Sequence, residues 1–431
     1  MLIRFWTENC LSLRDKQELS FVASSLGKQG GKTVAMPGGN TDLLCAAAIY
    51  GGNASGKTNV INAFSLMRST ILDSHSRWKG REGIADRSFY FDTVSRKKPT
   101  RFELDLLLDG VRYVYGFSMD RKIVLEETLY AYPRGKRQLW LERNAKSASQ
   151  FKFGKKLGGE NRTIEKLTRP NSLFLSAAAQ NNHPQLSPIY EWFLNQITIY
   201  SDTTRTQLDT ISSIENKELS ANEILRFMQL ADLGVSGIQL SDIDEDVPEN
   251  MKKLKAGVLD LFKSHVREEI AEEFSSMIPS KKINLLHSGY SGRKISLDFG
   301  LESHGTQTLF SLIGPLLKTA KSGGVIVIDE LENGMHPLLA RQLVRIFNSS
   351  KSNSKNAQLI FTTHSTNLLR EGLLRRDQVW LTEKDKKGAT RLYPLSDFKP
   401  RKTENIENGY LQGRYGAVPY LGEIDTLFQK E

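Results

Sequence analysis

The sequence predicts an α/β protein that combines a mostly parallel core sheet, an antiparallel β subdomain and an inserted helical lobe. Three observations lead to this prediction. Continuous apolar runs of strand length, such as LLCAAAIY at residues 43–50, are typical of strands buried on both faces. Late in the chain such runs alternate with amphipathic segments, as in doubly wound sheets. Between these regions, residues 88–132 alternate apolar and polar side chains, which indicates antiparallel strands.

The first part of the chain predicts strands followed by a loop and a helix. Alternation in LIRFWTENC and over residues 18–24 indicates two half-buried strands. The run at residues 43–50 predicts one central strand. It leads directly into GGNASGKT and then into the amphipathic segment NVINAFSLMRSTIL. We therefore expect the order strand, glycine-rich loop, helix.

The middle of the chain changes character twice. FELDLLLDG and VRYVYGFSM flank Asp109-Gly110, a strong hairpin signal. The polar residues 145–169 predict a mobile loop, and residues 212–278 predict helices. In the latter, apolar side chains recur every three or four residues from Leu254 to Met277, which indicates one helix with a core-facing side.

After Lys282 the pattern returns to strands and helices. INLLH and KISLDFG predict strands, SLIGPLLKTA a helix, and VIVIDE and QLIFTTH two strands separated by another helix. We divide the chain into residues 1–74 and 283–431, which form the two parts of the core, a basic β-rich insertion at 75–200 and a helical lobe at 201–282.

The net charge is +10, and it is unevenly placed. Between His75 and Pro170 there are 22 Lys and Arg residues against 12 Asp and Glu, a surplus equal to that of the whole chain. Such a region suits nucleic acid or an acidic protein, and a solvated lysine-rich face is an equal alternative. No apolar run is long enough to span a membrane. With two cysteines, Cys10 and Cys45, and no secretory signal, we expect a cytoplasmic protein.

Residues 51–58, GGNASGKT, match the P-loop pattern G-x-x-x-x-G-K-[ST]. Its glycines let successive backbone N–H groups point at phosphate oxygens, and the following helix directs its positive end to the same place. Lys57 is expected to reach the β- and γ-phosphates, and the Thr58 hydroxyl to bind Mg²⁺. Because the motif lies between a predicted strand and a predicted helix, we expect a nucleotide site rather than a glycine-rich turn.

VIVIDE supplies the acidic partner of this loop. Asp329 would emerge at the carboxyl end of a buried strand, where ligands of open α/β sheets bind, and would hold Mg²⁺ through water. Glu330 would act as general base on the attacking water.

Two further motifs define the class of P-loop protein. QLIFTTH places His364 at the same sheet edge, where its imidazole can contact the γ-phosphate. In LESHGTQTLFSL, Ser303 and Gly305 precede a predicted helix, whose N-terminus is an anion site or, alternatively, has an ordinary cap.

In this order the motifs resemble the ABC-type P-loop ATPase head of the RecF and structural-maintenance-of-chromosomes group. GGNASGKT, the signature-like ESHGTQ, the Walker B strand VIVIDE, the D-loop-like ENGMHP and TTHS carry the resemblance. It implies an ATP-sandwiched dimer or higher homo-oligomer, in which Ser303 and Gly305 act on the partner's γ-phosphate. His304 and Thr306 stand where the family more often has Gly and Gln or Glu.

The expected site follows from the residues and the resemblance together. Its cofactors are ATP and Mg²⁺, its catalytic residues are Lys57, Glu330 and His364, and its metal ligands are Thr58 and Asp329. The nucleotide-binding residues are Gly51, Gly52, Asn53, Ala54, Ser55, Gly56, Lys57, Thr58, Asn59, Ser303 and Gly305.

The late stretches LLRRDQVWLTEKD, LYPLSDFKPRK and YLQGRYGAVPYL resemble the AAA/ABC ATP-binding proteins of bacterial abortive-infection and restriction-linked loci. This resemblance implies a slow ATPase that senses a phage component or nucleic acid and controls a separate effector protein from a neighbouring gene. The residues after His364 show no acidic metal cluster, so we expect ATPase chemistry only. The alternatives are a RecF-like DNA clamp that binds through the basic 75–170 region, and a nucleotide-binding structural protein with little turnover.

Overall fold

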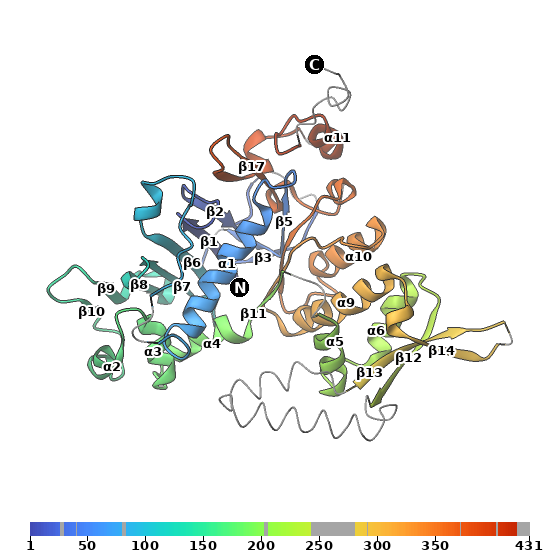
Figure 1. The fold of residues 1–431 in the computed structure, drawn as a ribbon, viewed down its shortest axis with the longest axis horizontal. Coiled ribbons are helices and arrows are strands. Elements are labelled where there is room, and N and C mark those ends of the chain that lie inside the picture. The colour runs from blue at the N-terminus through green and yellow to red at the C-terminus, as the bar shows by residue number, and fades with distance from the viewer. Residues whose placement is uncertain are drawn as a thin grey trace, which may run out of the picture. The chain divides into compact units, whose positions relative to one another are not determined.

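The computed structural model describes residues 1–25, 30–39, 41–79, 83–201, 206–242, 281–290, 292–370, 372–401 and 404–419. The chain divides into two compact units. The first unit comprises Met1–Ser201, Thr319–Glu332 and Ala340–Glu431, and the second comprises Asp202–Lys318 and Asn333–Leu339. Figure 1 labels the elements of both.

A six-stranded sheet forms the centre of the first unit. Its order is β11 (Ile197–Tyr200), β15 (Val325–Ile328), β16 (Gln358–Thr362), β5 (Ala46–Tyr50), β17 (Val379–Lys384) and β18 (Thr390–Pro394). The first five strands run parallel, and β18 is antiparallel to β17. The carboxyl ends of the parallel strands therefore meet at one edge, as the sequence predicts.

The second sheet of this unit is antiparallel and has seven strands. Its order is β10 (Phe151–Phe153), β9 (Gln138–Asn144), β8 (Val124–Tyr132), β7 (Val111–Met119), β6 (Thr100–Leu108), β1 (Leu2–Glu8) and β2 (Gln17–Ser20). The predicted hairpin at Asp109-Gly110 joins β6 to β7. A short pair, β3 (Thr33–Ala35) and β4 (Asp42–Leu44), completes the strands of the first unit.

Helix α1 (Lys57–Asp73) links the two sheets (Figure 1). Its buried face, which includes Phe64 and Met67, belongs to one core with Ile49 of the parallel sheet and Leu104 of the antiparallel sheet. The other helices of this unit are α2 (Asn161–Leu167), α3 (Phe174–Gln180), α4 (Ser187–Asn195) and α11 (Ile406–Leu411).

The second unit contains α5 (Thr206–Glu215), α6 (Ala221–Leu230) and the antiparallel strands β12 (Val235–Asp242), β13 (Lys281–Ser288) and β14 (Lys294–Asp298). Two helices begin in this unit and end in the first, α9 (His304–Ser322) and α10 (Pro337–Asn348). Short 3-10 helices are η1 (Ser95–Lys97), η2 (Pro133–Gly135), η5 (Phe299–Leu301), η6 (Thr366–Leu369), η7 (Arg376–Gln378) and η8 (Leu395–Phe398). Among the described helices, none combines the length and apolar character that crossing a membrane requires.

Three sequence predictions need correction. Residues 43–50 are not one strand, because β4 pairs with β3 and the chain bends at Cys45 before β5 enters the parallel sheet. Both segments are fully buried, so their apolar run gives no sign of the bend. Residues 145–169 contain β10 and α2, since Phe151 and Phe153 pack on Phe174. The predicted helical region also contains strand β12, and the helix predicted from Leu254 to Met277 lies outside the described residues.

A buried charge pair holds the antiparallel sheet to helix α3. The Glu127 carboxylate accepts the backbone N–H groups of Phe174 (2.7 Å) and Leu175 (3.0 Å) at the start of α3. Arg143, 3.9 Å from Glu127, donates to the carbonyls of Ser172 and Pro170. The side chains are 0% and 2% exposed. The two charges compensate each other. Their side chains also provide hydrogen-bond partners for backbone N–H and carbonyl groups at and just before the start of α3 that would otherwise be buried without one.

We expect Glu127→Ala to lower the free energy of unfolding by about 3–5 kcal/mol, because it leaves the Arg143 guanidinium buried without its counter-charge. Urea denaturation measures this loss. The neighbouring Glu126, half-exposed and paired with Arg101, is the matched control, and Glu126→Ala should cost less than about 1 kcal/mol. Equal losses in the two variants would contradict the role given to Glu127.

Candidate functional site

The glycine-rich loop connects β5 directly to α1, as the P-loop pattern requires. Gly56 has φ +107°, which favours glycine, and a Cβ there would overlap the Thr390 side chain. A Cβ on Gly51 would overlap Thr382 and Ser55. Both glycines are therefore needed for the close approach of strands β17 and β18 to the loop, in addition to their expected use for phosphate.

Side-chain hydroxyl groups that are distant in sequence hydrogen-bond the loop and stabilise its conformation. Thr382 on β17 hydrogen-bonds the Ser55 hydroxyl at 2.7 Å and donates to the Tyr50 carbonyl at 3.0 Å. Thr390 on β18 donates to the Ser55 carbonyl at 2.9 Å and contacts the Ser12 hydroxyl at 2.8 Å. These threonines are at most 2% exposed, so the loop conformation is fixed by buried hydrogen bonds.

Lys57 is buried at the centre of the site, with a relative exposure of 6%. Its ammonium group donates to the carbonyls of Gly51 (3.0 Å) and Gly52 (3.2 Å). Burial lowers the pKa of Lys57, and the nearby carboxylates of Asp329, Glu330 and Glu332 act in the opposite direction. The structure therefore places the P-loop lysine within electrostatic reach of both predicted Walker B acids.

Thr362, at the end of β16, organises the Walker B acids. Its hydroxyl donates to the Asp329 carboxylate at 2.5 Å and accepts the backbone N–H of Glu330 at 2.7 Å. Glu330 has φ +51°, a left-handed conformation that is uncommon outside glycine and concentrates at functional sites. The bond to Thr362 supports this backbone turn, and the Glu330 side chain is exposed.

His364 follows β16 at the same edge, and Glu332 fixes its backbone. The Glu332 carboxylate accepts the backbone N–H groups of His364 (2.5 Å) and Ser365 (3.1 Å). Although His364 is exposed, partial desolvation and the positive charge of Lys57 lower its pKa against the opposing effect of the nearby carboxylates, which favours the neutral imidazole. Sequence reasoning placed Glu332 only in the D-loop-like motif and missed its contact with the histidine segment.

The predicted residues fall into three groups. Lys57, Asp329, Glu330 and His364 meet at one edge of the parallel sheet. Thr58, Asn53 and Ala54 are exposed at the loop and the first turn of α1, and Asn59 donates to the Ser12 hydroxyl at 2.7 Å. Ser303 and Gly305 belong to the second unit. Their expected action on the nucleotide of a partner protomer stays a prediction.

Within the second unit, the signature-like turn and the D-loop-like motif pack on each other. The Ser303 hydroxyl accepts the Thr306 backbone N–H at 3.2 Å, an ordinary cap of α9. Gly334 has φ +71°, and a Cβ there would overlap the His304 imidazole. His304, which departs from the family pattern, therefore forms the contact between the two motifs.

Residues 406–419, which include the described part of YLQGRYGAVPYL, contact both the P-loop and the histidine segment. The Tyr410 hydroxyl donates to the Ala417 carbonyl at 3.1 Å, and the Glu383 carboxylate accepts the Ala417 N–H at 2.7 Å. These bonds place Pro419 against Gly52 of the P-loop. In α11, Glu407 accepts from Thr366 and Arg370, which follow the histidine.

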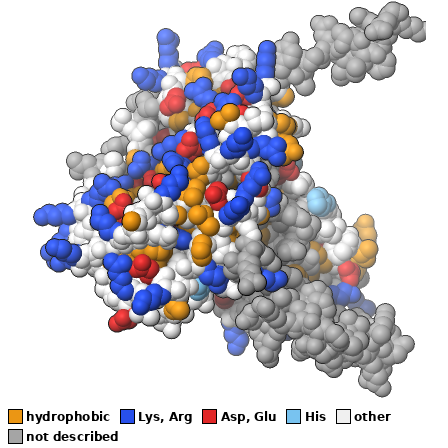
Figure 2. All heavy atoms as spheres, turned by 60° about the vertical axis from the view of Figure 1, so that its left-hand side comes forward, with side chains coloured by type: hydrophobic (Ala, Val, Ile, Leu, Met, Phe, Trp, Pro, Cys, Tyr) orange, Lys and Arg blue, Asp and Glu red, His pale blue; other side chains and the backbone are white. Residues whose placement is uncertain are grey.

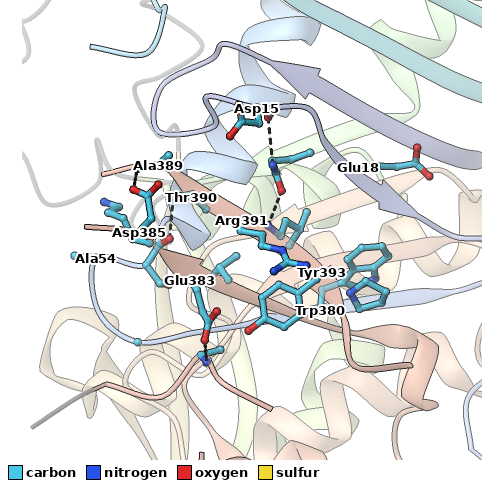
Figure 3. Close-up of a pocket in the computed structure, with 18 of the residues that line it drawn as sticks. Asp15, Glu18, Ala54, Trp380, Glu383, Asp385, Ala389, Thr390, Arg391 and Tyr393 are labelled. Atoms are coloured by element: carbon cyan, nitrogen blue, oxygen red, sulfur yellow. Dashed lines mark hydrogen bonds between the residues drawn. The ribbon is translucent and has the colours of Figure 1, made fainter. Parts of the chain in front are cut away.

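A cavity of about 1170 Å³ lies beside the loop (Figure 3). One wall is formed by P-loop residues 52–55, and another by the β17–β18 hairpin with Glu383, Asp385 and Arg391. The Trp380 indole also lines it. The phosphate loop therefore faces open space rather than packed protein on this side.

The donor set fits ATP with Mg²⁺. A threonine hydroxyl at position 58 and the Asp329 carboxylate are hard oxygen ligands, and Mg²⁺ sites commonly use one or two protein ligands together with substrate phosphates and water. Among the described residues, no group of three or more His, Cys, Asp or Glu side chains is placed to hold a metal ion.

We expect Thr390→Val to weaken ATP binding, because it removes the buried hydroxyl that joins Ser55 to Ser12 without changing side-chain volume. A loss of about 1–2 kcal/mol raises the Kd roughly 5- to 30-fold. Titration with a fluorescent ATP analogue measures it. Thr128→Val, a half-buried threonine on β8, is the matched control, and unchanged affinity in Thr390→Val would contradict the bracing role.

One family model covers the part of the chain that carries these motifs. A family model described as "AAA domain, putative AbiEii toxin, Type IV TA system" matches residues 46–370, about three quarters of the chain. No curated protein sequence matches. Two solved structures are similar over most of the chain. The SMC head domain from Thermotoga maritima has 13% identity and a TM-score of 0.40, with 91% of this chain and 98% of that chain covered. An SmcHead bound to the C-winged helix domain of ScpA has 12% identity and a TM-score of 0.45, with 95% and 99% covered.

The matched residues span the P-loop, the signature-like turn, the Walker B strand, the D-loop-like motif and the switch histidine, which carried the predicted resemblance to an ABC-type ATPase head. The late stretches after residue 370 lie outside the match. The chain therefore belongs to the AAA domain family whose members are described as putative AbiEii toxins of type IV toxin–antitoxin systems.

Proposed function

We propose that the protein binds ATP with Mg²⁺ at the P-loop and hydrolyses it slowly. The observation that supports this proposal best is the convergence of Lys57, Asp329, Glu330 and His364 at one sheet edge. A glycine-rich loop with an ammonium group can bind the phosphates, and the two carboxylates can hold Mg²⁺ and position the attacking water. The His364 imidazole adds a group that can reach the γ-phosphate.

Each residue then has a defined task. Lys57 and the loop N–H groups bind the phosphates, and Thr58 and Asp329 hold Mg²⁺, which neutralises phosphate charge when bound. Glu330, exposed at the end of β15, accepts a proton from the attacking water. The neutral His364 imidazole donates a hydrogen bond to the γ-phosphate through one ring nitrogen.

We further propose that nucleotide binding drives assembly of two or more copies. In the second unit, the contact between His304 and Gly334 makes the signature-like turn and the D-loop-like motif one continuous surface. Leu301 and Leu338 on either side are 73% and 61% exposed. Exposed apolar side chains suit contact with another protein surface. The N-terminus of α9 beside them suits a phosphate that this partner surface presents.

The assembly would act as a sensor or scaffold for a separate effector protein in antiphage defence. The description of the family as part of a toxin–antitoxin system supports a two-component arrangement. Part of the basic charge of the β-rich region is paired within the antiparallel sheet itself. On the antiparallel sheet, Arg112 pairs with Asp105, Arg101 with Glu126 and Lys152 with Glu142. Figure 2 shows Lys and Arg side chains interspersed with Asp and Glu across this face of the molecule.

We expect Glu330→Gln to bind ATP, to lose at least 100-fold in hydrolysis rate and to accumulate as an ATP-bound oligomer, because it keeps the shape of the site but loses the base. Lys57→Ala should neither bind ATP nor assemble. Phosphate release and sedimentation with and without ATP measure these outcomes, with the exposed Glu160→Gln as control. Equal, negligible phosphate release from wild type and Glu330→Gln would favour a structural nucleotide site.

A mixing experiment tests composite sites. Lys57→Ala lacks a working P-loop, and Ser303→Arg lacks a working signature turn, so each alone should be inactive. In a mixed dimer, the intact P-loop of one protomer faces the intact signature of the other, and part of the hydrolysis should return. Mixed dimers that form, by sedimentation of tagged protomers, but hydrolyse no ATP would contradict the trans arrangement.

A further inference from the structure

An exposed group of apolar side chains with basic neighbours lies on the first unit, outside the nucleotide motifs. Tyr90, Phe91 and Val94 are 68%, 75% and 61% exposed. Basic side chains accompany them, since the Arg96 guanidinium lies 4.4 Å from the centre of the Tyr90 ring and Lys97 and Lys98 follow in η1 and after it. We call Tyr90, Phe91, Val94, Arg96, Lys386 and Lys387 the aromatic–basic patch.

Two segments far apart in sequence form this patch. The turn between β17 and β18 carries Lys386 and Lys387, and Gly388 in that turn has φ +81° with its Cα against the Phe91 ring. Together they enclose a cavity of about 730 Å³, lined by Arg14, Phe89, Phe91, Asp92, Lys386, Lys387 and Gly388. Its lining contains two aromatic rings, a single carboxylate and three basic side chains, of which Arg14 is paired with Asp15 at 2.8 Å and Lys386 and Lys387 are exposed.

The acidic side chains near the patch are already engaged within the protein. Asp92 accepts the Val94 and Ser95 backbone N–H groups at 3.0 and 3.2 Å and caps η1. Asp385 accepts the backbone N–H groups of Lys387 and Ala389, both at 2.8 Å. Asp86 binds Ser88 and forms an ion pair with Arg121. Local turns thus use these carboxylates, whereas Lys386 and Lys387 are exposed.

Exposed aromatic rings among basic side chains favour an anion that also carries flat, unpaired bases. Rings that are two thirds or more exposed offer flat faces to unpaired bases, while the basic side chains bind the backbone phosphates. A DNA duplex hides its base faces, and an acidic peptide gains nothing from ring stacking. None of the P-loop residues lines this cavity, which separates it from the phosphate loop.

We propose that the aromatic–basic patch is a binding site for single-stranded nucleic acid, with bases stacked on Tyr90 and Phe91 and phosphates held by Lys386 and Lys387. This site is independent of ATP hydrolysis at the P-loop. The proposed site lies beside the β17–β18 hairpin. Thr382 and Thr390 of the same hairpin hydrogen-bond Ser55 of the P-loop.

The test measures binding of fluorescein-labelled 12-mer DNA and RNA, single-stranded and duplex, to the full-length protein by fluorescence anisotropy. The wild type should bind the single strands more tightly than the duplexes. The double variant Tyr90→Ala/Phe91→Ala should bind single strands about 5- to 100-fold more weakly, as expected when stacked bases lose their aromatic partners.

Charge is tested separately. Lys386→Ala/Lys387→Ala should reduce the slope of log K against log salt by about 1.4, or about 0.7 for each phosphate that is no longer neutralised. Lys155→Ala/Lys156→Ala removes the same charge from an exposed loop of the basic region and should leave the slope unchanged. Tyr290→Ala, an exposed tyrosine of the second unit, controls for the loss of an aromatic ring. Thermal melting confirms that each variant is folded.

Any of four outcomes would overturn the proposal. One is that wild type binds no oligonucleotide at low salt, even if it captures an acidic protein. Another is tighter binding of duplex, or equal losses in the patch variants and their controls. In the last, Tyr90→Ala/Phe91→Ala weakens ATP binding but leaves oligonucleotide binding unchanged, which would make the patch a base pocket for the protein's own nucleotide.

Discussion

The buried ammonium group of Lys57 is the constraint on which the nucleotide site depends. An ammonium ion removed from water is costly unless partners compensate it. Two P-loop carbonyls accept its hydrogen bonds, and three carboxylates on the segment after β15 supply counter-charge. This arrangement requires β15, β16 and β5 to be adjacent and parallel, because only then do the loops that follow them meet at one edge.

Contacts between distant segments give this site its shape. Thr382 and Thr390 lie more than 300 residues after Ser55, yet their hydroxyls fix its side chain and carbonyl. Ser12, near the start of the chain, joins Thr390 to Asn59. The late GRYGAVP segment adds Pro419 behind Gly52. Residues near both ends of the described chain thus contact the P-loop or its bracing threonine. Substitutions at either end can therefore alter the conformation of the phosphate loop.

The placement of the P-loop and of the Walker B acids at one sheet edge could be predicted because their signals are local. The P-loop needs certain residues at fixed spacing between a strand and a helix, and Asp329 and Glu330 directly follow an apolar strand. The sequence analysis did not predict the roles of Thr362, Thr382 and Glu332. These roles depend on which strands are adjacent in the sheet, and the spacing of residues in the sequence does not show that order. A threonine that ends an apolar run, as in QLIFTT and VWLT, was the available signal. The bend at Cys45 and the anchoring of Phe151 and Phe153 on Phe174 likewise depend on tertiary packing.

The chain belongs to an AAA domain family, and we propose that it hydrolyses ATP at the P-loop and binds partners through further surfaces. The most direct test of the central claim is a structure of the Glu330→Gln protein with ATP and Mg²⁺. We predict the γ-phosphate within hydrogen-bonding distance of Lys57 and His364, with Mg²⁺ between Thr58 and Asp329. A nucleotide bound elsewhere, or one whose γ-phosphate contacts neither Lys57 nor His364, would contradict the account.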